Sequence, residues 1–213
     1  QDAMTQYSVL SGEMKKATRQ ARFYPVLATT GTEASVDELQ AIWEQEKSAE
    51  ALEALKQCTN FKAIVPLLKA ARAGDEGALA RYVALVSQWE TDTDARSARL
   101  VEALGIAGSD KGKARVLAAL AATPTRNAFL AAGKCLDSKG VANQAAAAEK
   151  DILGKTQEDI EYDIVKANME KAIDIYKAHG SADDGYAVDE IRKMLADLRP
   201  SPVFTLPDEE KKE

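Results

Sequence analysis

The sequence predicts an all-α fold, in which antiparallel helix pairs stack as a short HEAT-like α–α superhelix; a closed helical bundle is the alternative. Three observations support this prediction. Apolar residues recur every three or four positions along most of the chain, which is the spacing of one helix face. Alanine, the best helix former, supplies much of the 46% hydrophobic content. The breaks between apolar stripes are short, and short connections favour antiparallel neighbours.

The first half of the chain contains four apolar stripes. Ser35-Val-Asp-Glu38 predicts a capping box that opens the first helix. Gly74 predicts the end of the third helix, and Pro66 within that helix predicts either a first turn or a kink. The four stripes comprise Val36, Leu39, Ile42 and Trp43; Leu52 and Leu55; Phe61, Ile64, Val65, Leu68 and Ala71; and Leu79, Tyr82, Val83, Val86 and Trp89.

Six further stripes follow in the second half. Residues 105–108 predict a break, Ser109 a helix cap, and residues 123–125 a turn. Residues 156–159 predict the cap of the longest helix, and Gly180 predicts its end. The stripes comprise Ala98, Val101 and Leu104; Val116, Leu117 and Leu120; Phe129, Leu130, Gly133 and Leu136; an alanine-rich face that reaches Ile152; Tyr162, Val165, Met169, Ala172, Ile173 and Tyr176; and Val188, Ile191, Leu195 and Leu198.

An internal similarity favours repetition. The segments ALEALKQCTNFKAIVPLLKAA (residues 51–71) and VLAALAATPTRNAFLAAGKCL (residues 116–136) share their apolar register at an offset of 65 residues. This offset is close to two helix-pair repeats, and such units bury a continuous core by stacking on their neighbours. The matched positions are Leu52/Leu117, Ala54/Ala119, Leu55/Leu120 and Ile64/Phe129.

The charge balance argues against nucleic-acid binding. The formal net charge is −6 at pH 7 and the pI is about 5.1, whereas contact with a phosphate backbone needs clustered Lys and Arg. The densest basic group, Lys15, Lys16, Arg19 and Arg22, fits a solvated helix face. No apolar run reaches the roughly 20 residues that a membrane-spanning helix needs, so the sequence predicts no membrane span.

Cysteine usage and the first residue bear on the cellular compartment. Cys58 and Cys135 form no disulfide framework, and each lies in an apolar helical context that favours a free, buried thiol. The chain begins with Gln1 rather than Met, so we expect either a removed signal peptide or a trimmed sequence. We favour the first alternative, which predicts a secreted or periplasmic protein.

No residue pattern predicts catalysis, a cofactor or a bound metal. His179 is the only histidine, and it precedes Gly180 in a last turn, where it interacts favourably with the helix dipole. The segment GSDKGKA (residues 108–114) lacks the spacing of a phosphate-binding loop and predicts a turn and a helix start. The acidic clusters at 158–163 and 183–190 fit solvated faces better than acid–base sites, and we expect the first in the opening turns of the longest helix.

Trp43 and Trp89 are the candidate contact residues for a partner or a glycan. Tryptophan is enriched at interfaces because its large ring combines an apolar body with a polar N–H. Both residues fall on apolar stripes, so packing within or between repeats is the competing interpretation. An exposed groove rimmed by either ring would favour glycan binding.

Three segments carry a resemblance to a known repeat region: FYPVLA (23–28), LKQCTNFKAIVPLLKAA (55–71) and AATPTRNAFLAAGKCLDS (121–138). Together, residues 23 to about 153 resemble the HEAT-like helical repeat regions of secreted Bacteroidetes proteins, in which the repeats precede a 3-keto-disaccharide hydrolase domain. The resemblance implies a carbohydrate-processing parent protein. No hydrolase active-site motif lies within the 213 residues, so no catalytic residue carries over. The alanine-rich helix that follows Val141 departs from the repeat pattern.

Residues 199–213 predict a linker. Pro200, Pro202 and Pro207 each remove a backbone donor and fix φ, and the apolar residues between them alternate as in an extended strand. The stretch MLADLRPSPVFTLPDEEKKE, from Met194 onwards, resembles the junction that leads into that hydrolase domain. We therefore expect a helical repeat domain over residues 1–198, followed by an extended linker to a further, C-terminal domain.

The sequence thus predicts a non-catalytic interaction module of a secreted carbohydrate-processing hydrolase. Its expected partner is its own C-terminal hydrolase domain, another protein or a carbohydrate, and not nucleic acid. Two alternatives remain. One is a standalone helical binding protein for peptide or glycan, and the other is an enzyme that uses an acidic cleft.

Overall fold

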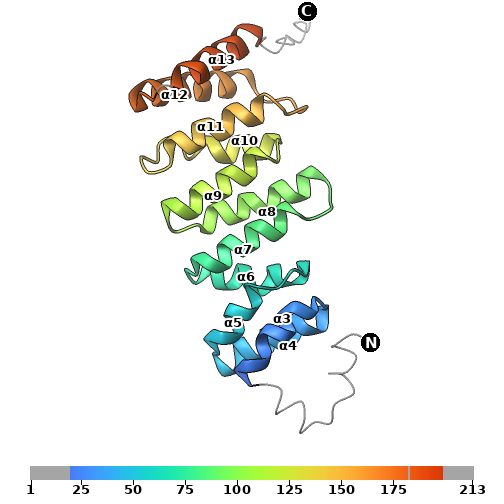
Figure 1. Cartoon of the computed structure of the whole chain (residues 1–213). Coiled ribbons are helices and arrows are strands. Elements are labelled where there is room, and N and C mark those ends of the chain that lie inside the picture. The colour runs from blue at the N-terminus through green and yellow to red at the C-terminus, as the bar shows by residue number, and fades with distance from the viewer. Residues whose placement is uncertain (1–19, 182, 199–213) are drawn as a thin grey trace, which may run out of the picture.

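The computed structural model describes residues 20–181 and 183–198 (Figure 1). Within these ranges the chain forms helices and no strand, so the predicted all-α class is confirmed. The predictions for Gln1, for Lys15, Lys16 and Arg19 of the basic group, and for the linker at 199–213 concern residues outside these ranges, whereas Arg22 of that group is described and is exposed on η1. The elements are η1 (Ala21–Phe23), α3 (Tyr24–Thr30), α4 (Glu33–Glu46), α5 (Ala49–Leu55), η2 (Phe61–Ala63), α6 (Ile64–Arg72), α7 (Glu76–Ser87), α8 (Thr93–Ile106), α9 (Asp110–Ala121), α10 (Arg126–Gly133), α11 (Ala142–Leu153), α12 (Tyr162–His179) and α13 (Asp184–Asp197).

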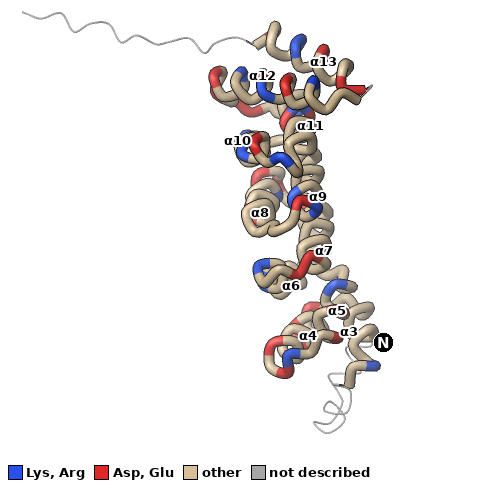
Figure 2. The backbone as a smooth tube through the Cα atoms, turned by 90° about the vertical axis from the view of Figure 1, so that its left-hand side faces the viewer, with Lys and Arg blue, Asp and Glu red and all other residues tan. Residues whose placement is uncertain are grey.

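The helices form a two-layer array that follows chain order from one end of the molecule to the other (Figure 1). In the view turned by 90°, α4, α6, α8 and α10 lie along one side, and α3, α5, α7 and α9 lie along the other (Figure 2). The extensive contacts join elements that are one or two positions apart along the chain, such as α6 with α7 and α7 with α9. Short connections between amphipathic helices produce such antiparallel neighbours.

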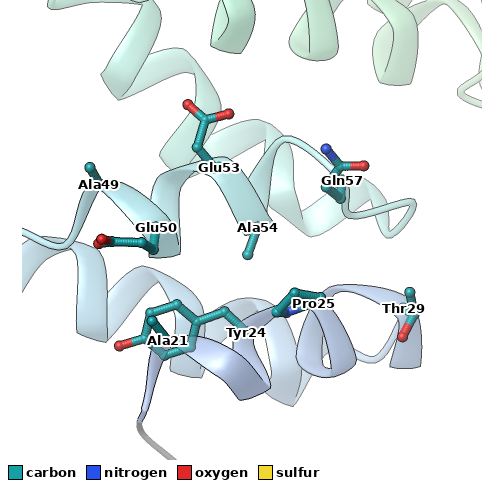
Figure 3. A pocket seen from close by; sticks show the side chains of 9 residues that line it. All are labelled: Ala21, Tyr24, Pro25, Thr29, Ala49, Glu50, Glu53, Ala54 and Gln57. Atoms are coloured by element: carbon teal, nitrogen blue, oxygen red, sulfur yellow. The ribbon is translucent and has the colours of Figure 1, made fainter.

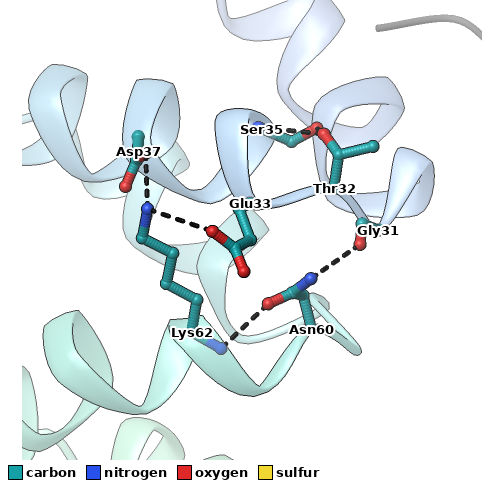
Figure 4. A network of polar contacts seen from close by, with 7 residues as sticks. All are labelled: Gly31, Thr32, Glu33, Ser35, Asp37, Asn60 and Lys62. Atoms are coloured by element: carbon teal, nitrogen blue, oxygen red, sulfur yellow. Dashed lines mark hydrogen bonds and ion pairs between the residues drawn. The ribbon is translucent and has the colours of Figure 1, made fainter.

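The layering changes after α5. This helix contacts α3 and α4 extensively, and the link to the rest of the array runs through η2, which packs on both α4 and α7. Polar contacts supplement this link. Lys62 Nζ lies 2.6 Å from Asp37 Oδ2 (Figure 4), and the guanidinium of Arg81 donates to the Cys58 carbonyl at 2.6 and 3.0 Å. We call this region, η2 with these contacts, the η2 junction.

The 65-residue offset in the sequence corresponds to two helix pairs. Leu52 lies in α5 and its match Leu117 in α9, while Ile64 begins α6 and its match Phe129 lies in α10. Helices α5 and α9 belong to one layer, and α6 and α10 to the other (Figure 2). The matched residues therefore occupy equivalent places in the array.

One apolar core runs through the array between the two layers. Burying a Leu, Ile or Phe side chain contributes about 1.5–3 kcal/mol, so these residues dominate the free energy of folding. Alanine fills many of the remaining core positions, which lets neighbouring helices approach closely. The largest fully buried side chains are Tyr82, Phe129, Leu39, Ile42, Leu55, Leu67, Leu100, Leu117, Leu120, Ile152, Met169 and Ile191.

The predicted capping box at Ser35–Glu38 is wrong, because α4 begins at Glu33, three residues before the Val36 that a Ser35 cap would make its first residue. The N-cap is Thr32, whose Oγ1 accepts a hydrogen bond from the Ser35 backbone N–H at 3.2 Å (Figure 4). Ser35 is fully buried, and its hydroxyl hydrogen-bonds with the hydroxyls of Thr30 and Thr32. Serine and threonine both favour N-caps, so the sequence alone does not choose between two such residues three positions apart.

The predicted cap at residues 156–159 is also wrong. Helix α12 begins only at Tyr162, and no side chain caps it. Thr156 Oγ1 accepts a hydrogen bond from the Glu158 N–H at 3.2 Å, which is a local turn. The Glu158 carboxylate in turn accepts from the backbone N–H of Arg126, the first residue of α10, at 2.6 Å. Glu158 therefore serves the N-terminus of a different helix, where the helix dipole also favours a carboxylate.

Four other helix boundaries agree with their predictions. Ser109 caps α9, and Gly180 ends α12 with φ +70°. Pro66 lies in the first turn of α6, the first of its two alternatives. Gly74 has φ +97° and follows the end of α6, where a residue without Cβ adopts this conformation without strain.

Two buried faces are shifted from their predicted stripes. In α6, Leu67 is buried and Val65 is 60% exposed. In α8, Ser97 and Leu100 are buried, whereas Ala98 is exposed. Adjacent apolar residues, as in α6, allow two registers for a helical stripe. In α8 the buried face includes the polar Ser97, which an apolar pattern does not predict.

Thr125→Val should lower the free energy of unfolding by about 2 kcal/mol, measured by urea denaturation. Thr125 Oγ1 caps α10 by accepting from the Ala128 N–H at 3.1 Å, and it hydrogen-bonds with the buried Ser97 hydroxyl at 2.6 Å. Valine keeps the shape but removes both contacts. Thr125→Ser keeps the hydroxyl and should cost about 1 kcal/mol or less. Equal stability of the two variants would contradict the role given to the hydroxyl.

Candidate functional site

A groove of about 550 Å³ lies between α3 and α5 at the N-terminal end of the array (Figure 3). This volume is within the range of ordinary ligand pockets, about 300–1,000 Å³. Pro25 and Ala54 point toward one another across it, whereas Glu53 and Gln57 point from the α5 side away from α3 (Figure 3). The groove is lined by Ala21, Tyr24, Pro25, Thr29, Ala49, Glu50, Glu53, Ala54 and Gln57.

Two unusually short helices produce this groove. Helices α3 and α5 have seven residues each, whereas α7 and α9 in the same layer have twelve each. Gly31 ends α3 with φ +66°, and Ser48 begins α5 by accepting from the Ala51 N–H at 3.1 Å. Because a helix rises 1.5 Å per residue, seven residues span only about 10 Å, and the pair covers less of the layer than its longer neighbours.

The outer edge of the groove is acidic. Glu50 and Glu53 are exposed one turn apart on α5. Glu53 Oε1 lies 2.7 Å from Lys56 Nζ, which also pairs with Asp75 at 2.9 Å. Burial alone would lower the pKa of Lys56, but the hydrogen bonds to Glu53 and Asp75 outweigh burial and raise this pKa. Glu50 accepts a hydrogen bond from the Ser48 hydroxyl at 3.1 Å and adds a second carboxylate beside this pair.

The two tryptophans lie away from this groove and from each other. The Trp89 ring, just after α7, stacks on Phe61 with ring centroids 4.4 Å apart. Trp43 is half-buried on α4, and Lys69 Nζ lies 5.8 Å from its ring centroid. Phe61 precedes α6 and Lys69 lies in its last turn, so the rings sit toward opposite ends of that helix. Contact of either tryptophan with a partner or a glycan stays a prediction.

The histidine and the acidic clusters take part in local pairs. His179 Nδ1 lies 2.9 Å from Asp184 Oδ2. Glu190 pairs with Lys150 at 2.7 Å and so joins α13 to α11. The first acidic cluster was expected in the opening turns of α12, but most of it precedes that helix, as Glu158 shows. In the part of the chain that the structure describes, no group of three His, Cys, Asp or Glu side chains could hold a metal ion.

Glu149 is the chemically unusual residue that the sequence prediction missed. It lies on the alanine-rich face of α11 and is fully buried. Asn168 Nδ2 of α12 donates to Glu149 Oε1 at 2.7 Å, and Oε2 has no hydrogen-bond partner among the described residues. Burial raises the pKa of Glu149 to about 8, although the Asn168 hydrogen bond and the charge of Lys171 lower it. This carboxyl group is therefore largely protonated at pH 7.

Gly133, the last residue of α10, leaves room for the Glu149–Asn168 pair. A Cβ at this position would collide with Asn168 Nδ2 and would lie 2.7 Å from Glu149 Oε1. The three residues come from three consecutive helices, α10, α11 and α12. No local pattern in the sequence could bring them together, and a single Glu in an alanine run is typical of a solvated position.

Both cysteines are free and buried, as the sequence favours. Burial raises the pKa of Cys58 to about 11, although the charge of Arg81 lowers it, and burial also raises the pKa of Cys135. At pH 8 the Cys58 thiolate fraction is then on the order of 0.1%. We expect native protein to react with Ellman's reagent far more slowly than free glutathione, and urea-unfolded protein to release two equivalents. Fast, complete reaction of the native protein would contradict the buried placement.

No protein-family model, curated protein or solved structure matches this chain. Among the described helices, none is both long enough and apolar enough to cross a membrane. The function is therefore inferred from the arrangement of the chain's own residues.

Proposed function

We propose that this chain is a non-catalytic helical-repeat module, a HEAT-like superhelix that positions a carbohydrate-processing hydrolase domain in a secreted or periplasmic protein. The observation that carries the proposal is the two-layer array. Its helices pack on their neighbours along the chain, so the array presents long outer faces and a groove at one end (Figures 1 and 3). Stacked helical repeats commonly provide extended binding surfaces of this kind.

The sequence supports the identity of the attached domain. Residues 55–71 and 121–138 resemble the repeat regions that precede 3-keto-disaccharide hydrolase domains, and the stretch from Met194 onwards resembles the junction between them. These two repeat segments fall at equivalent places in the array, since α6 and α10 occupy the same layer. We therefore propose the hydrolase type as well as the positioning role.

The reading frame of the gene provides the first test. A hydrolase domain encoded downstream of residue 213, together with a signal peptide upstream of residue 1, would support the proposal. A stop codon directly after Glu213 would contradict it.

An activity assay provides the second test. The 213-residue chain and a version extended through the downstream domain are assayed on 3-keto-glycosides, and we expect hydrolysis by the extended version only. Activity of the 213-residue chain by itself would overturn the non-catalytic role.

A standalone binding protein for peptide or glycan is the second candidate, and the groove favours it. Its largely apolar lining with a carboxylate edge suits a peptide better than a sugar, which needs several directional polar partners. Screening the chain against immobilised oligosaccharides separates the two ligand classes. Saturable glycan binding that is lost on Trp43→Ala or Trp89→Ala would instead favour the glycan.

A further inference from the structure

We propose that the groove between α3 and α5 binds an amphipathic helical peptide that carries Lys or Arg beside its apolar face. This inference rests on the interaction role proposed above and assigns one surface to one partner class. The peptide would occupy the place that longer helices occupy farther along the same layer.

The shape of the groove suits a helix. Neighbouring helices in proteins pack 8–10 Å apart, and they need small or interlocking side chains at the contact. Here the two walls are formed largely by α3 and α5, which have seven residues each. The small side chains of Ala21, Ala49 and Ala54 in the lining allow a helix to approach closely. An apolar groove between two helices is a recurrent binding site for an amphipathic helix, whose anchors repeat every three or four residues.

Apolar surface continues from the groove onto α3. Val26, next to the groove residue Pro25, is 50% exposed, and Pro25 itself is exposed. A partner that covers both the groove and Val26 would remove this apolar surface from water.

Charge selects the kind of helix. The α3 wall, residues Tyr24–Thr30, contains no charged residue, and the exposed Arg22 precedes it next to the groove residue Ala21, so the carboxylates come from α5. There Lys56 is shared between Glu53 and Asp75, while Glu50 contributes a further exposed carboxylate. The edge is therefore net negative, and it favours a peptide with basic residues along one flank and disfavours an acidic one.

The test uses the 213-residue chain and a designed peptide. The probe is a fluorescein-labelled 14-residue peptide with leucine every three or four positions and lysine along one flank, and its binding is followed by fluorescence anisotropy. Thr29, which lines the groove and is exposed, is changed to Trp to fill it. Thr93→Trp, at an exposed site that begins α8, is the matched control. We expect at least about tenfold weaker binding for Thr29→Trp and no change for Thr93→Trp.

Removal of the two carboxylates on α5 tests the contribution of charge. Glu50→Gln combined with Glu53→Gln should weaken binding of the lysine peptide about fivefold and reduce its dependence on salt. A peptide with glutamate in place of lysine should bind the unaltered chain at least about fivefold more weakly. Equal binding of the lysine and glutamate peptides would overturn the charge assignment, and equal binding by the Thr29→Trp chain would overturn the groove assignment.

Photo-crosslinking identifies the occupant. With benzoylphenylalanine at position 29, a crosslink to the lysine peptide supports the proposal. A crosslinked dimer of the chain, or a crosslink to residues 1–19 of the same chain, would overturn it in favour of a second copy or of the chain's own segment. None of these measurements involves a hydrolase domain. Failure of peptide binding is therefore distinguishable from failure of the proposed function, which the reading frame decides.

Discussion

Glu149→Gln should stabilise the protein at pH 7 by about 2 kcal/mol. Glu149 is fully buried, and burial raises its pKa from an ordinary value of 4.5 to about 8. The folded state must therefore keep a proton that the unfolded state releases, which costs about 3 kcal/mol at pH 7. Glutamine removes this cost and keeps the acceptor for Asn168, but its amide N–H then lacks a partner, which takes back about 1 kcal/mol.

The stability difference between Glu149→Gln and the unaltered protein should depend on pH. Below pH 4.5 Glu149 is protonated in both states and costs nothing. Between pH 4.5 and about 8 the folded state binds more protons than the unfolded state, so stability falls as pH rises. Relative to the unaltered protein, Glu149→Gln should therefore change from about 1 kcal/mol less stable at pH 4.5 to its full advantage above pH 8.

Urea denaturation at pH 5, 7 and 8.5 measures this effect. Glu170→Gln, at an exposed position on the neighbouring α12, is the matched control and should change stability by about 0.5 kcal/mol or less at each pH. A constant difference between Glu149→Gln and the unaltered protein across this range would show that Glu149 does not titrate as inferred.

Phe129→Ala should lower the free energy of unfolding by about 3–5 kcal/mol. Phe129 is one of the two largest fully buried side chains in the described chain, and it lies on α10 near the middle of the array. Alanine leaves a cavity that the surrounding helices close only in part. Leu130→Ala, at the adjacent half-buried position, should cost about 2 kcal/mol or less.

The arrangement of the helices also predicts which of them Phe129→Ala destabilises most. Helix α10 packs extensively on α8, α9 and α11, whereas α3 and α4 lie several positions away. Since each unit of a stacked array interacts mainly with its neighbours, native-state hydrogen exchange should accelerate most in α8–α11. Uniform acceleration along the chain would contradict this local coupling and would indicate one cooperative unit.

Periodicity in the sequence predicted the helical class correctly, although it misplaced the buried faces of α6 and α8. The all-α class and the boundaries at Gly74, Ser109 and Gly180 follow from residue types whose local role depends little on the rest of the fold. The prediction was wrong at a helix N-terminus where two residues that favour N-caps lie close together in the sequence. Thr32 rather than Ser35 caps α4, because tertiary packing buries the serine hydroxyl against two threonines.

The candidate site could not be predicted because it depends on helix length and on contacts between helices. The groove arises from two short helices whose residues, such as Pro25 and Ala54, are individually unremarkable. Glu149 and Asn168 are brought together by packing of α11 on α12, with Gly133 supplying the space. Trp43 and Trp89 were predicted as contact residues because of their residue type, and neither of them lines this groove.

The η2 junction has a mechanical consequence. Most of the array is held by close-packed apolar contacts, which resist deformation. At the η2 junction the apolar core continues, but extensive helix-to-helix packing is replaced by a single 3₁₀ turn and side-chain links such as Lys62–Asp37. Ion pairs at the surface are weak and are screened by salt. We therefore expect the array to deform more readily at the η2 junction than elsewhere, and such bending would change the direction in which the groove faces.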